Sequence, residues 1–321
     1  MPDIISAILW PIKWVIEAIL VAFHSLLTTL GMNTDDGLTW VLSIVGLVLV
    51  VRAALIPIFV RQIKSQRRML EVAPQIKKIQ DRYKGKKDQF SREAMSRETM
   101  ELYKRTGTNP LSSCLPLLLQ MPIFFGLFSV LSNAQNPAIE QGVGLLNAEL
   151  SRSFGTAELF GAPLHLAIST ADGNVLVIVI AVIMVILMTG SQFITQLQIM
   201  SKNQSPEMKA SPAFKQQRIL LYILPLVFAF SGFTFPLGVM FYWLTSNFWT
   251  MVQQFIVIRN MPTPGSEAAQ AREARVARKN QRRGITVSEI DSTGETVEEV
   301  KRTQRVQPVN KNRAKKSGNK K

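Results

Sequence analysis

The chain has 321 residues, of which 47% are hydrophobic and only 18% are charged, yet its formal net charge is +15. A soluble protein with this net charge would carry a larger charged fraction, and a disordered basic protein would carry far fewer apolar residues. Charged and apolar side chains must therefore occupy different stretches, as in a multi-span membrane protein with basic loops. The single cysteine, Cys114, excludes an internal disulfide framework and a cysteine-based zinc site.

The first apolar segment, residues 4–30, carries Lys13 and Glu17 and places Trp10 and Trp14 on one face. This pattern favours a helix that lies in the membrane interface over a membrane span. Residues 1–37 are therefore expected to form an interfacial helix followed by an outer loop. The apolar residues follow no basic cluster and precede no A-x-A cleavage site, which argues against a signal peptide.

Five later stretches are apolar enough to cross the hydrocarbon, which needs about 20 mostly apolar residues. They are residues 38–60, 111–133, 174–200, 219–235 and 237–258. The last two are joined by a tight turn that ends at Pro236, so they are expected to form a helical hairpin. The fold expected is an all-α membrane protein with five transmembrane helices, an N-terminal interfacial helix and a cytoplasmic helical hairpin.

Basic residues are confined to alternate connections. Residues 61–110 hold 14 basic and 6 acidic side chains, residues 201–218 hold 4 and 1, and residues 259–321 hold 16 and 7. The intervening segments, 31–37 and 134–173, are net acidic. Cytoplasmic loops carry the excess of Lys and Arg, so the basic connections and the C-terminus are expected in the cytoplasm and residues 134–173 outside.

Two cytoplasmic segments have recognisable patterns. Within residues 61–110, apolar side chains such as Ile76, Ile79 and Tyr83 recur at helical spacing, which predicts two antiparallel helices with Pro74 bending or restarting the first. This hairpin could equally be a solvated loop with no role of its own. Residues 259–321 are expected to form a basic, largely disordered tail.

The charge of the tail suits phosphate, either of ribosomal RNA or of lipid headgroups. The alternative is that its charge serves only to fix the topology. The expected contact residues are the last six basic side chains, namely Lys311, Arg313, Lys315, Lys316, Lys320 and Lys321.

One charge lies deep in an expected span. Arg52 is roughly 12 Å from the cytoplasmic end of the first span at the helical rise per residue. A mid-membrane arginine costs about 2.5–3.5 kcal/mol to insert, so such a residue normally faces protein or water. The other interpretation is a side chain that extends to the inner interface.

Polar residues of three other spans lie at similar depth. They are Gln120 of the second span, Thr189, Gln192 and Gln196 on one face of the third, and Thr245, Ser246 and Asn247 of the fifth. Each alone is explained by an interhelical hydrogen bond. Together with an arginine that has no acidic partner in the spans, they predict a hydrated cavity open to the cytoplasm and closed toward the outside.

Motifs of enzymatic chemistry are absent. The sequence holds no glycine-rich phosphate loop, no Ser/His/Asp set and no H-E-x-x-H motif, so there is no case for an enzyme or a bound cofactor. His24 and His165 are interpreted as solvated or interfacial polar residues, and Cys114 as a small packing residue.

Several runs of residues between positions 38 and 259 resemble a known family. They are Val51-Arg52-Ala53-Ala54, Asn109-Pro110-Leu111, Cys114-x-Pro116, Gln120-Met121-Pro122-Ile123-Phe124, Tyr242-Trp243, Ser246-Asn247 and Gln253-Gln254. These runs resemble the YidC/Oxa/Alb family of membrane protein insertases. The sequence shows neither the large outer domain of Gram-negative members nor the lipobox cysteine of many Gram-positive ones, which favours a Gram-positive or actinobacterial type.

The resemblance implies a bacterial plasma membrane protein with a positively charged groove, open to cytoplasm and lipid. Its implied partners are nascent membrane proteins, the Sec translocon, the ribosome and the lipid bilayer, and insertion would proceed without nucleotide hydrolysis. By the resemblance Arg52 would be the groove arginine. The lining residues would be Gln120, either Gln192 or Gln196, Tyr242, Trp243 and Asn247.

Two other functions are compatible with parts of the pattern. A transporter or channel subunit could use Arg52 as an anion site, but it would predict inverted repeats, which the sequence does not show. A membrane anchor whose tail recruits RNA or ribosomes would leave the polar groups inside the membrane unexplained.

Overall fold

The computed structural model describes residues 2–86, 88–108, 115–134, 142–209 and 212–282. The chain is mostly helical. The elements are α1 (Pro2–Thr29), α2 (Gly37–Arg82), α3 (Gln89–Thr106), α4 (Leu115–Ala134), α5 (Ala148–Thr156), β1 (Glu158–Leu159), β2 (Ala162–Pro163), the 3-10 turn η2 (Ile168–Thr170), α6 (Val175–Lys202), α7 (Pro206–Lys209), α8 (Pro212–Thr234), α9 (Leu237–Asn260) and α10 (Glu267–Arg282).

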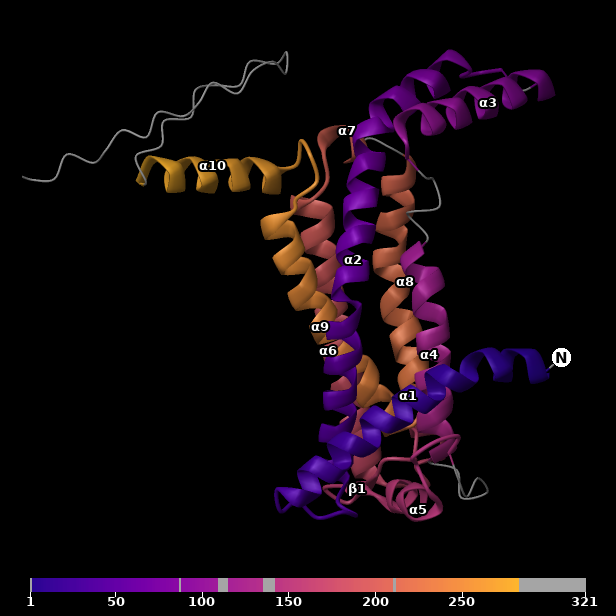
Figure 1. Cartoon of the computed structure of the whole chain (residues 1–321), viewed down its shortest axis with the longest axis vertical. Helices are drawn as coiled ribbons and strands as arrows, with labels where there is room; N and C mark the ends of the chain where they lie inside the picture. Colours follow the sequence, from indigo (N-terminus) through magenta and orange to yellow (C-terminus); the bar gives the residue numbers. More distant parts are fainter. Residues whose placement is uncertain (1, 87, 109–114, 135–141, 210–211, 283–321) are drawn as a thin grey trace, which may run out of the picture.

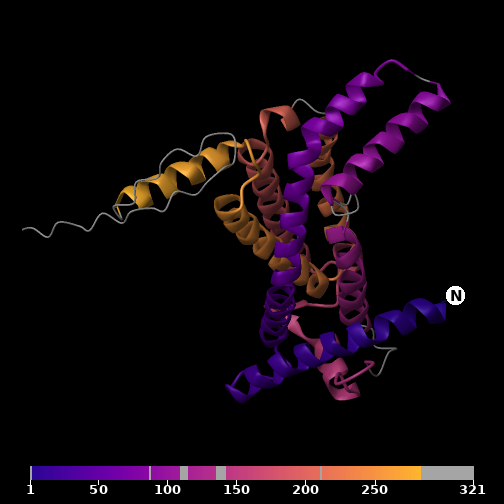
Figure 2. The ribbon, with the colours of Figure 1, turned by 45° about the horizontal axis from the view of Figure 1, so that its top comes forward.

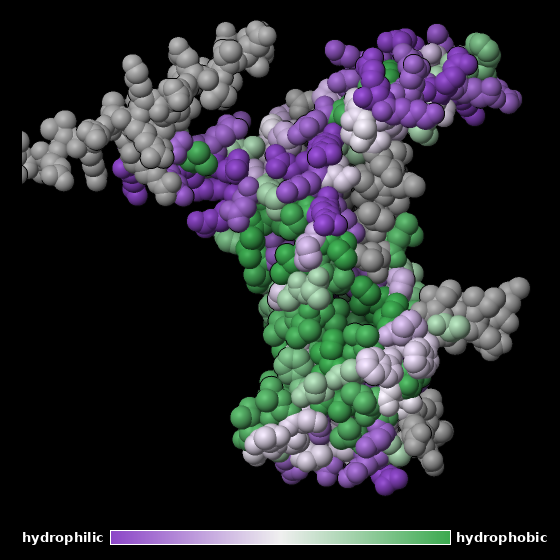
Figure 3. All heavy atoms as spheres, in the orientation of Figure 1, coloured by the Kyte–Doolittle hydropathy of each residue, from purple (hydrophilic) through white to green (hydrophobic). Residues whose placement is uncertain are grey.

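Helices α2, α4, α6, α8 and α9 form an elongated bundle, and α1 crosses one end of it obliquely (Figures 1 and 2). We call this the cap end, because residues 142–174, the cap, cover it. The opposite end carries α3 and α10 and is called the hairpin end. The visible surface is apolar along the middle of the bundle and strongly polar around α3 and α10 (Figure 3).

Three of the described helices are long and apolar enough to cross a membrane: α2, α6 and the part of α1 from Leu9 to Thr29. A shorter apolar stretch, Leu221–Thr234, lies in α8. A mostly helical, multi-span membrane fold is therefore confirmed. The expected number of five membrane-spanning helices is not confirmed by this criterion. Helix α1, expected in the interface, meets the criterion by length and composition, although it lies obliquely to the bundle (Figure 1).

Helix α2 is a single helix from the cap end to the tip of the hairpin. The sequence analysis divided it near residue 60 and expected Pro74 to bend or restart the second part. In the structure both Pro57 and Pro74 lie inside the continuous helix. Proline removes one backbone hydrogen bond from a helix, yet α2 continues through both prolines, which lie on exposed faces. The bundle and the hairpin therefore share one rigid element.

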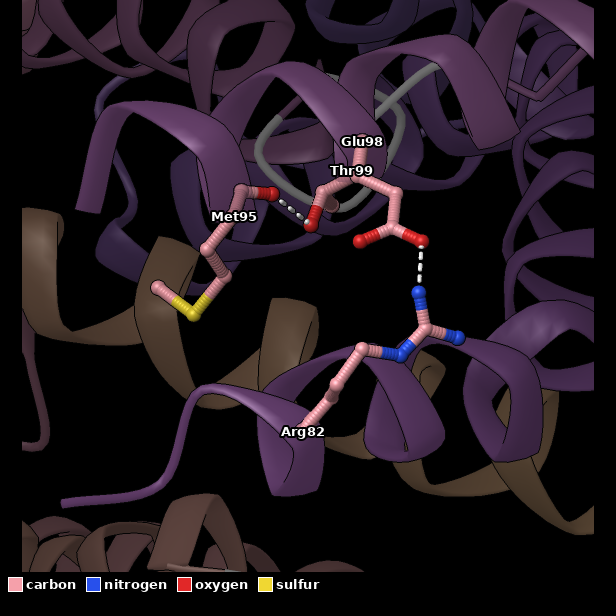
Figure 4. A network of polar contacts seen from close by, with 4 residues as sticks. All are labelled: Arg82, Met95, Glu98 and Thr99. Carbon is pink, nitrogen blue, oxygen red and sulfur yellow. Dashed lines mark hydrogen bonds and ion pairs between the residues drawn. The ribbon is translucent and has the colours of Figure 1, made fainter. Parts of the chain in front are cut away.

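The hairpin is formed by the end of α2 and by α3. Its small core consists of Val72, Ile79 and Leu102. Arg82 of α2 forms an ion pair with Glu98 of α3, and the Thr99 hydroxyl donates a 2.7 Å hydrogen bond to the carbonyl of Met95 (Figure 4). Asp88 caps α3: its carboxylate accepts a hydrogen bond from the backbone N–H of Ser91, and this bond lowers the pKa of Asp88.

The polar face of α1 points into the protein. Glu17 is 2% exposed, and its two carboxylate oxygens accept hydrogen bonds from the backbone N–H groups of Val143, at 2.9 Å, and Gly144, at 2.6 Å. A side chain at Gly142 would collide with the same carboxylate. The exposed Trp10 and Trp14 occupy other positions of the helix. The Glu17 carboxylate therefore fastens the cap to α1.

His24 is buried, which corrects the expectation of a solvated or interfacial residue. Its ring stacks on Trp40 of α2 with a centroid distance of 4.0 Å, and its Nε2 lies 3.0 Å from the carbonyl oxygen of Thr34. Trp40 in turn donates to the Ser153 hydroxyl at 3.2 Å and lies against Phe154 of α5. This network joins α1, α2 and the cap, and its long-range pairings could not be read from sequence.

The cap also closes over the start of α9. The first N–H groups of a helix have no partner within the helix. Here the N–H of Leu237 donates to the carbonyl of Leu166, and the N–H of Gly238 donates to that of Leu164, both at 3.0 Å. Leu164 and Leu237 are fully buried in the main hydrophobic core. The cap is therefore part of the bundle's packing.

The first part of the basic tail is helical, where the sequence analysis expected no regular structure. Helix α10 begins after Ser266, whose side chain is fully buried and accepts a hydrogen bond from the N–H of Ala269 at 3.2 Å. The helix is composed largely of Ala, Arg, Glu and Gln, which are strong helix formers. The sequence analysis considered the charge of this segment and overlooked its helix propensity. Residues 283–321 lie outside the described part of the chain.

We predict that Glu17→Gln destabilises the cap, because an amide presents only one acceptor oxygen to the two N–H groups of Val143 and Gly144. A buried donor left without a partner costs about 1–3 kcal/mol. Thermal unfolding of the solubilised protein and protease cleavage within residues 142–174 measure the effect. Glu149→Gln, which changes an exposed carboxylate of the same segment, is the control. Equal melting temperatures and cleavage rates for the two variants would contradict the prediction.

Candidate functional site

Helices α2 and α4 are closely packed at the cap end and less buried toward the hairpin end, whereas α6 has buried side chains as far as Thr195 and α9 as far as Ile258. In α2 the buried positions run from Gly37 to Val48, and no residue from 49 to 61 is buried. The same change occurs along α4, where the side chains whose burial is described become buried only from Gly126 onward. Arg52 lies just past the end of the tightly packed part. The site is built around this boundary.

Arg52 is held by α9. Its guanidinium donates a hydrogen bond to the hydroxyl of Ser246, a buried residue on the inner face of α9. Tyr242 precedes Ser246 by one helical turn and is 3% exposed, so the two side chains face the same way. The sequence analysis noted Ser246 as a polar residue of the fifth span but did not include it among the groove residues. The sequence feature that could have identified Ser246 is its spacing of one helical turn from Tyr242.

A small cavity of about 10 Å³ lies beside Arg52, which is room for about one water molecule. It is lined by α2, α4 and α9, through Val48, Val51, Arg52, Leu55, Gln120, Ile123, Leu127 and Tyr242. The structure therefore brings together three of the predicted residues: Arg52, Gln120 and Tyr242.

Arg52 has no ionic partner in the described structure: among the residues described, the ion pair is that between Arg82 and Glu98. Burying a cation without a carboxylate is costly unless hydroxyl, amide or water dipoles solvate it. Ser246 supplies one such group, and Gln120 and Tyr242 are among the residues that line the adjoining cavity. The arrangement leaves a positive charge whose field is not cancelled, which suits it to attract negative or dipolar groups.

Trp243 belongs to a different cluster. Its ring stacks on Phe124 of α4, with a centroid distance of 5.7 Å and an interplanar angle of 8°, and meets Phe235 edge-on at 5.1 Å. Phe128 extends this cluster between α4 and α9. The cluster fixes the distance between the two helices that flank Arg52. Among the described residues, Trp243 does not line the Arg52 cavity.

The two third-span glutamines are half-buried on α6, and neither lines the Arg52 cavity as described. The adjacent Ser191 and Thr195 are buried and hydrogen-bond to carbonyls of their own helix, at 3.0 Å and 2.8 Å. Helix α6 packs extensively on α9. The structure therefore does not bring Gln192 or Gln196 to the Arg52 cavity.

Asn247 carries an amide nitrogen that is buried and has no hydrogen-bond partner within the described residues. It follows Ser246 directly on α9. Buried polar atoms in native proteins are nearly always paired, so an unpaired one marks a position where water or a bound group is expected.

Some of the predicted residues lie outside the described part of the chain. They are Asn109, Pro110, Leu111 and Cys114, and the tail residues from Lys311 to Lys321.

Two residues of α1, Glu17 and His24, help to hold the cap in place, and this role was not predicted from the sequence. The sequence signal for both was weak, because each is a polar residue on the inner face of a mostly apolar helix. Their partners, Val143 and Thr34, lie in segments without a regular pattern. Only the folded chain brings these pairs together.

Comparison with known proteins identifies a family whose description is 60Kd inner membrane protein, and the family model matches residues 32–264. The chain is 44% identical to the membrane protein insertase YidC of Tropheryma whipplei (strain Twist), over 98% of this chain and 97% of the relative. It is 45% identical to the YidC of Streptomyces avermitilis, over 84% of this chain and 61% of the relative. The YidC of Bifidobacterium longum is 36% identical, over 96% and 95% of the two chains.

We predict that solvent reaches the bundle interior from the hairpin end. Single cysteines in place of Gln120 and Gln192, in a Cys114→Ser chain, should react with a polar maleimide added on the hairpin side. Cysteines in place of Val177 or Ile180, which lie near the cap end of α6, should react far more slowly because that half is tightly packed. Labelling rates measured in inside-out vesicles decide this, and equal rates at both depths would indicate a channel through the bundle.

Proposed function

Because the chain belongs to the YidC family of membrane protein insertases, a family of multi-pass plasma membrane proteins, we propose that Arg52 receives the hydrophilic segments of nascent membrane proteins during insertion. The observation that carries this proposal is the position of Arg52. Its charge has no ionic partner in the described structure, and it lies where the tightly packed half of the bundle ends. A polar segment entering from the hairpin end therefore reaches this charge where the close packing of α2 begins.

The proposal includes a topology. Helices α2, α4, α6, α8 and α9 cross the membrane, α1 lies in the outer interface, and the cap is outside. The hairpin, α10 and the tail are then cytoplasmic, with residue limits close to those expected from sequence. The distribution of Lys and Arg supports this orientation, because the basic segments gather at the hairpin end and the cap is net acidic.

The physical problem of insertion is the passage of a polar tail through hydrocarbon. Each unsatisfied polar group costs several kcal/mol there. A polar entrance that reaches from the cytoplasmic side to Arg52 shortens the apolar path by about a third, because Arg52 lies roughly 12 Å from the cytoplasmic end of an expected span of 23 residues. The client's own apolar segment can then leave sideways into lipid, which the hydrophobic effect favours.

The cap makes this passage one-sided. Glu17, His24 and the start of α9 are all paired with cap or loop backbone groups, so the cap end presents few free polar groups to a client. For an acidic outer tail the membrane potential contributes about 2.3 kcal/mol per charge per 100 mV over the whole field. Arg52 attracts the tail. The membrane potential and the partitioning of the client's apolar segment into lipid then complete the transfer without nucleotide hydrolysis.

Further partners follow from where the cytoplasmic segments lie. We infer that the Sec translocon delivers some clients laterally and that ribosomes deliver others from the cytoplasmic side. The basic tail, with 16 basic and 7 acidic residues from position 259, supports contact with ribosomal RNA phosphate. The lipid bilayer is the second anionic surface that this face meets.

We predict that Arg52→Ala slows insertion of clients with acidic outer tails by roughly 10- to 100-fold, because a hydrogen bond to a charged group contributes about 1.5–3 kcal/mol. Arg52→Lys should retain much of the activity, since it keeps the charge. Insertion into proteoliposomes is the measurement.

Arg61→Ala is the control for the Arg52 variants, because Arg61 is an exposed arginine of the same helix. Wild-type rates for Arg52→Ala would remove the proposed role of the charge. An equal loss in Arg61→Ala would assign the effect to overall charge.

We also predict that deleting residues 304–321, which removes seven basic residues and no acidic one, weakens ribosome binding. The slope of log affinity against log salt should become shallower, because fewer phosphates are neutralised. Co-sedimentation with ribosomes in neutral detergent is the measurement. Post-translational insertion of a small client should be nearly unchanged. If ribosome affinity is the same for both chains, the tail is not the contact.

A further inference from the structure

Helix α10 carries a face made of positive charge. Each of its five basic residues lies three or four positions from another of them, which places all five on one side of the helix. They are Arg272, Arg275, Arg278, Lys279 and Arg282. The opposite side carries Glu273, Ala277 and Asn280. No residue of α10 is buried, so the side chains of this basic face are accessible along the helix.

The start of α10 is fixed to the bundle. The connection from α9 is the short segment 261–266, in which Thr263 and Ser266 are buried. The N–H of Thr263 donates a 2.8 Å hydrogen bond to the side-chain oxygen of Asn203 at the end of α6. Gly265 adopts a positive φ of 71° and lies against Ser205, which allows the tight turn. The direction of α10 is therefore set by the fold.

That direction is across the bundle axis. In Figure 1 α10 leaves the hairpin end sideways, at the level where the apolar surface in Figure 3 gives way to the polar one. Phe255 and Ile256, near the end of α9, are about half exposed, at 53% and 51%, as expected for side chains that face lipid. A helix placed here runs along the membrane surface.

One contact shows which face points to the membrane. The guanidinium of Arg275, at the centre of the basic face, donates a 2.7 Å hydrogen bond to the carbonyl of Arg259 in the last turn of α9. In the topology proposed above, on which this inference rests, α9 enters the membrane from this turn, so the basic face is turned toward the bilayer side. Glu273, Ala277 and Asn280 are then turned toward the cytoplasm.

We propose that the basic face of α10 binds the phosphate headgroups of anionic phospholipids in the cytoplasmic leaflet. This site is separate from Arg52 and from the terminal basic residues assigned above to the ribosome. Each basic residue near an anionic surface strengthens binding roughly fivefold. The contact would hold α10 flat beside the lateral opening of the bundle and fix the direction in which the tail leaves it. An RNA partner fits less well, because the face available to the cytoplasm carries Glu273 and no basic residue.

The test compares two labelled positions on α10 in full-length, otherwise cysteine-free protein with Cys114→Ser. A fluorophore at Ala271→Cys reports from the basic face, and one at Ala277→Cys reports from the opposite face. The protein is placed in nanodiscs of phosphatidylcholine, with or without phosphatidylglycerol, that contain a headgroup quencher. We expect phosphatidylglycerol to increase quenching at position 271 and to leave position 277 nearly unchanged.

Two variants of equal charge loss make the test specific. Arg272, Arg278, Lys279 and Arg282 are changed to Gln in the first, which keeps Arg275 and its contact with Arg259. Arg305, Lys311, Arg313 and Lys315 are changed to Gln in the second. The first should weaken docking by roughly several hundredfold, and so abolish the effect of phosphatidylglycerol, whereas the second should preserve it.

Equal quenching at position 271 in both lipid compositions would overturn the proposal. An equal loss in the two variants would also overturn it, by assigning the effect to net charge. If the α10 variant keeps its quenching but loses ribosome co-sedimentation, the face binds RNA and not lipid. Circular dichroism of the first variant checks that α10 is still helical, as expected because Gln is a strong helix former.

Discussion

A single cation inside the membrane constrains the rest of this protein. Arg52 needs polar neighbours at a depth where lipid offers none. Helix α9 brings Ser246 and Tyr242 to it, and α4 brings Gln120. The Ser246 hydroxyl solvates the charge without neutralising it, since no carboxylate pairs with it in the described structure. The three helices around Arg52 lie close enough to share a cavity of about 10 Å³.

The two ends of the bundle differ in how their polar groups are arranged. At the cap end, buried polar groups are paired with backbone partners: Glu17 with Val143 and Gly144, and the start of α9 with the carbonyls of Leu164 and Leu166. This end is rigid and offers a client few free polar groups. At the hairpin end, α2 has no buried residue from 49 to 61, and the charged segments α3 and α10 begin beyond it. The two ends of the bundle therefore differ both in how their polar groups are paired and in how far α2 is buried.

Much of the site was predictable from sequence. The depth of Arg52 and Gln120 follows from counting residues along apolar stretches, and the shared face of Tyr242 and Ser246 follows from the helical period. The division between basic and acidic connections predicted which end carries the hairpin. Other predictions were wrong or incomplete in instructive ways. His24 is buried because its ring stacks on Trp40, and residues 267–282 are helical because their composition favours a helix. The predictions from sequence rested on polarity and charge and missed both effects.

By itself the sequence determined the membrane-protein class, the charged and apolar segments, and the residues that lie at mid-membrane depth, because these depend on composition and on local periodicity. Only the tertiary structure decided which of those residues meet. Trp243 turns to Phe124, Gln192 and Gln196 stay on α6 away from the Arg52 cavity, and Ser246 becomes the partner of Arg52. The physical reason is that a helical period fixes the face of a side chain, whereas the neighbour it meets depends on how whole helices rotate and cross.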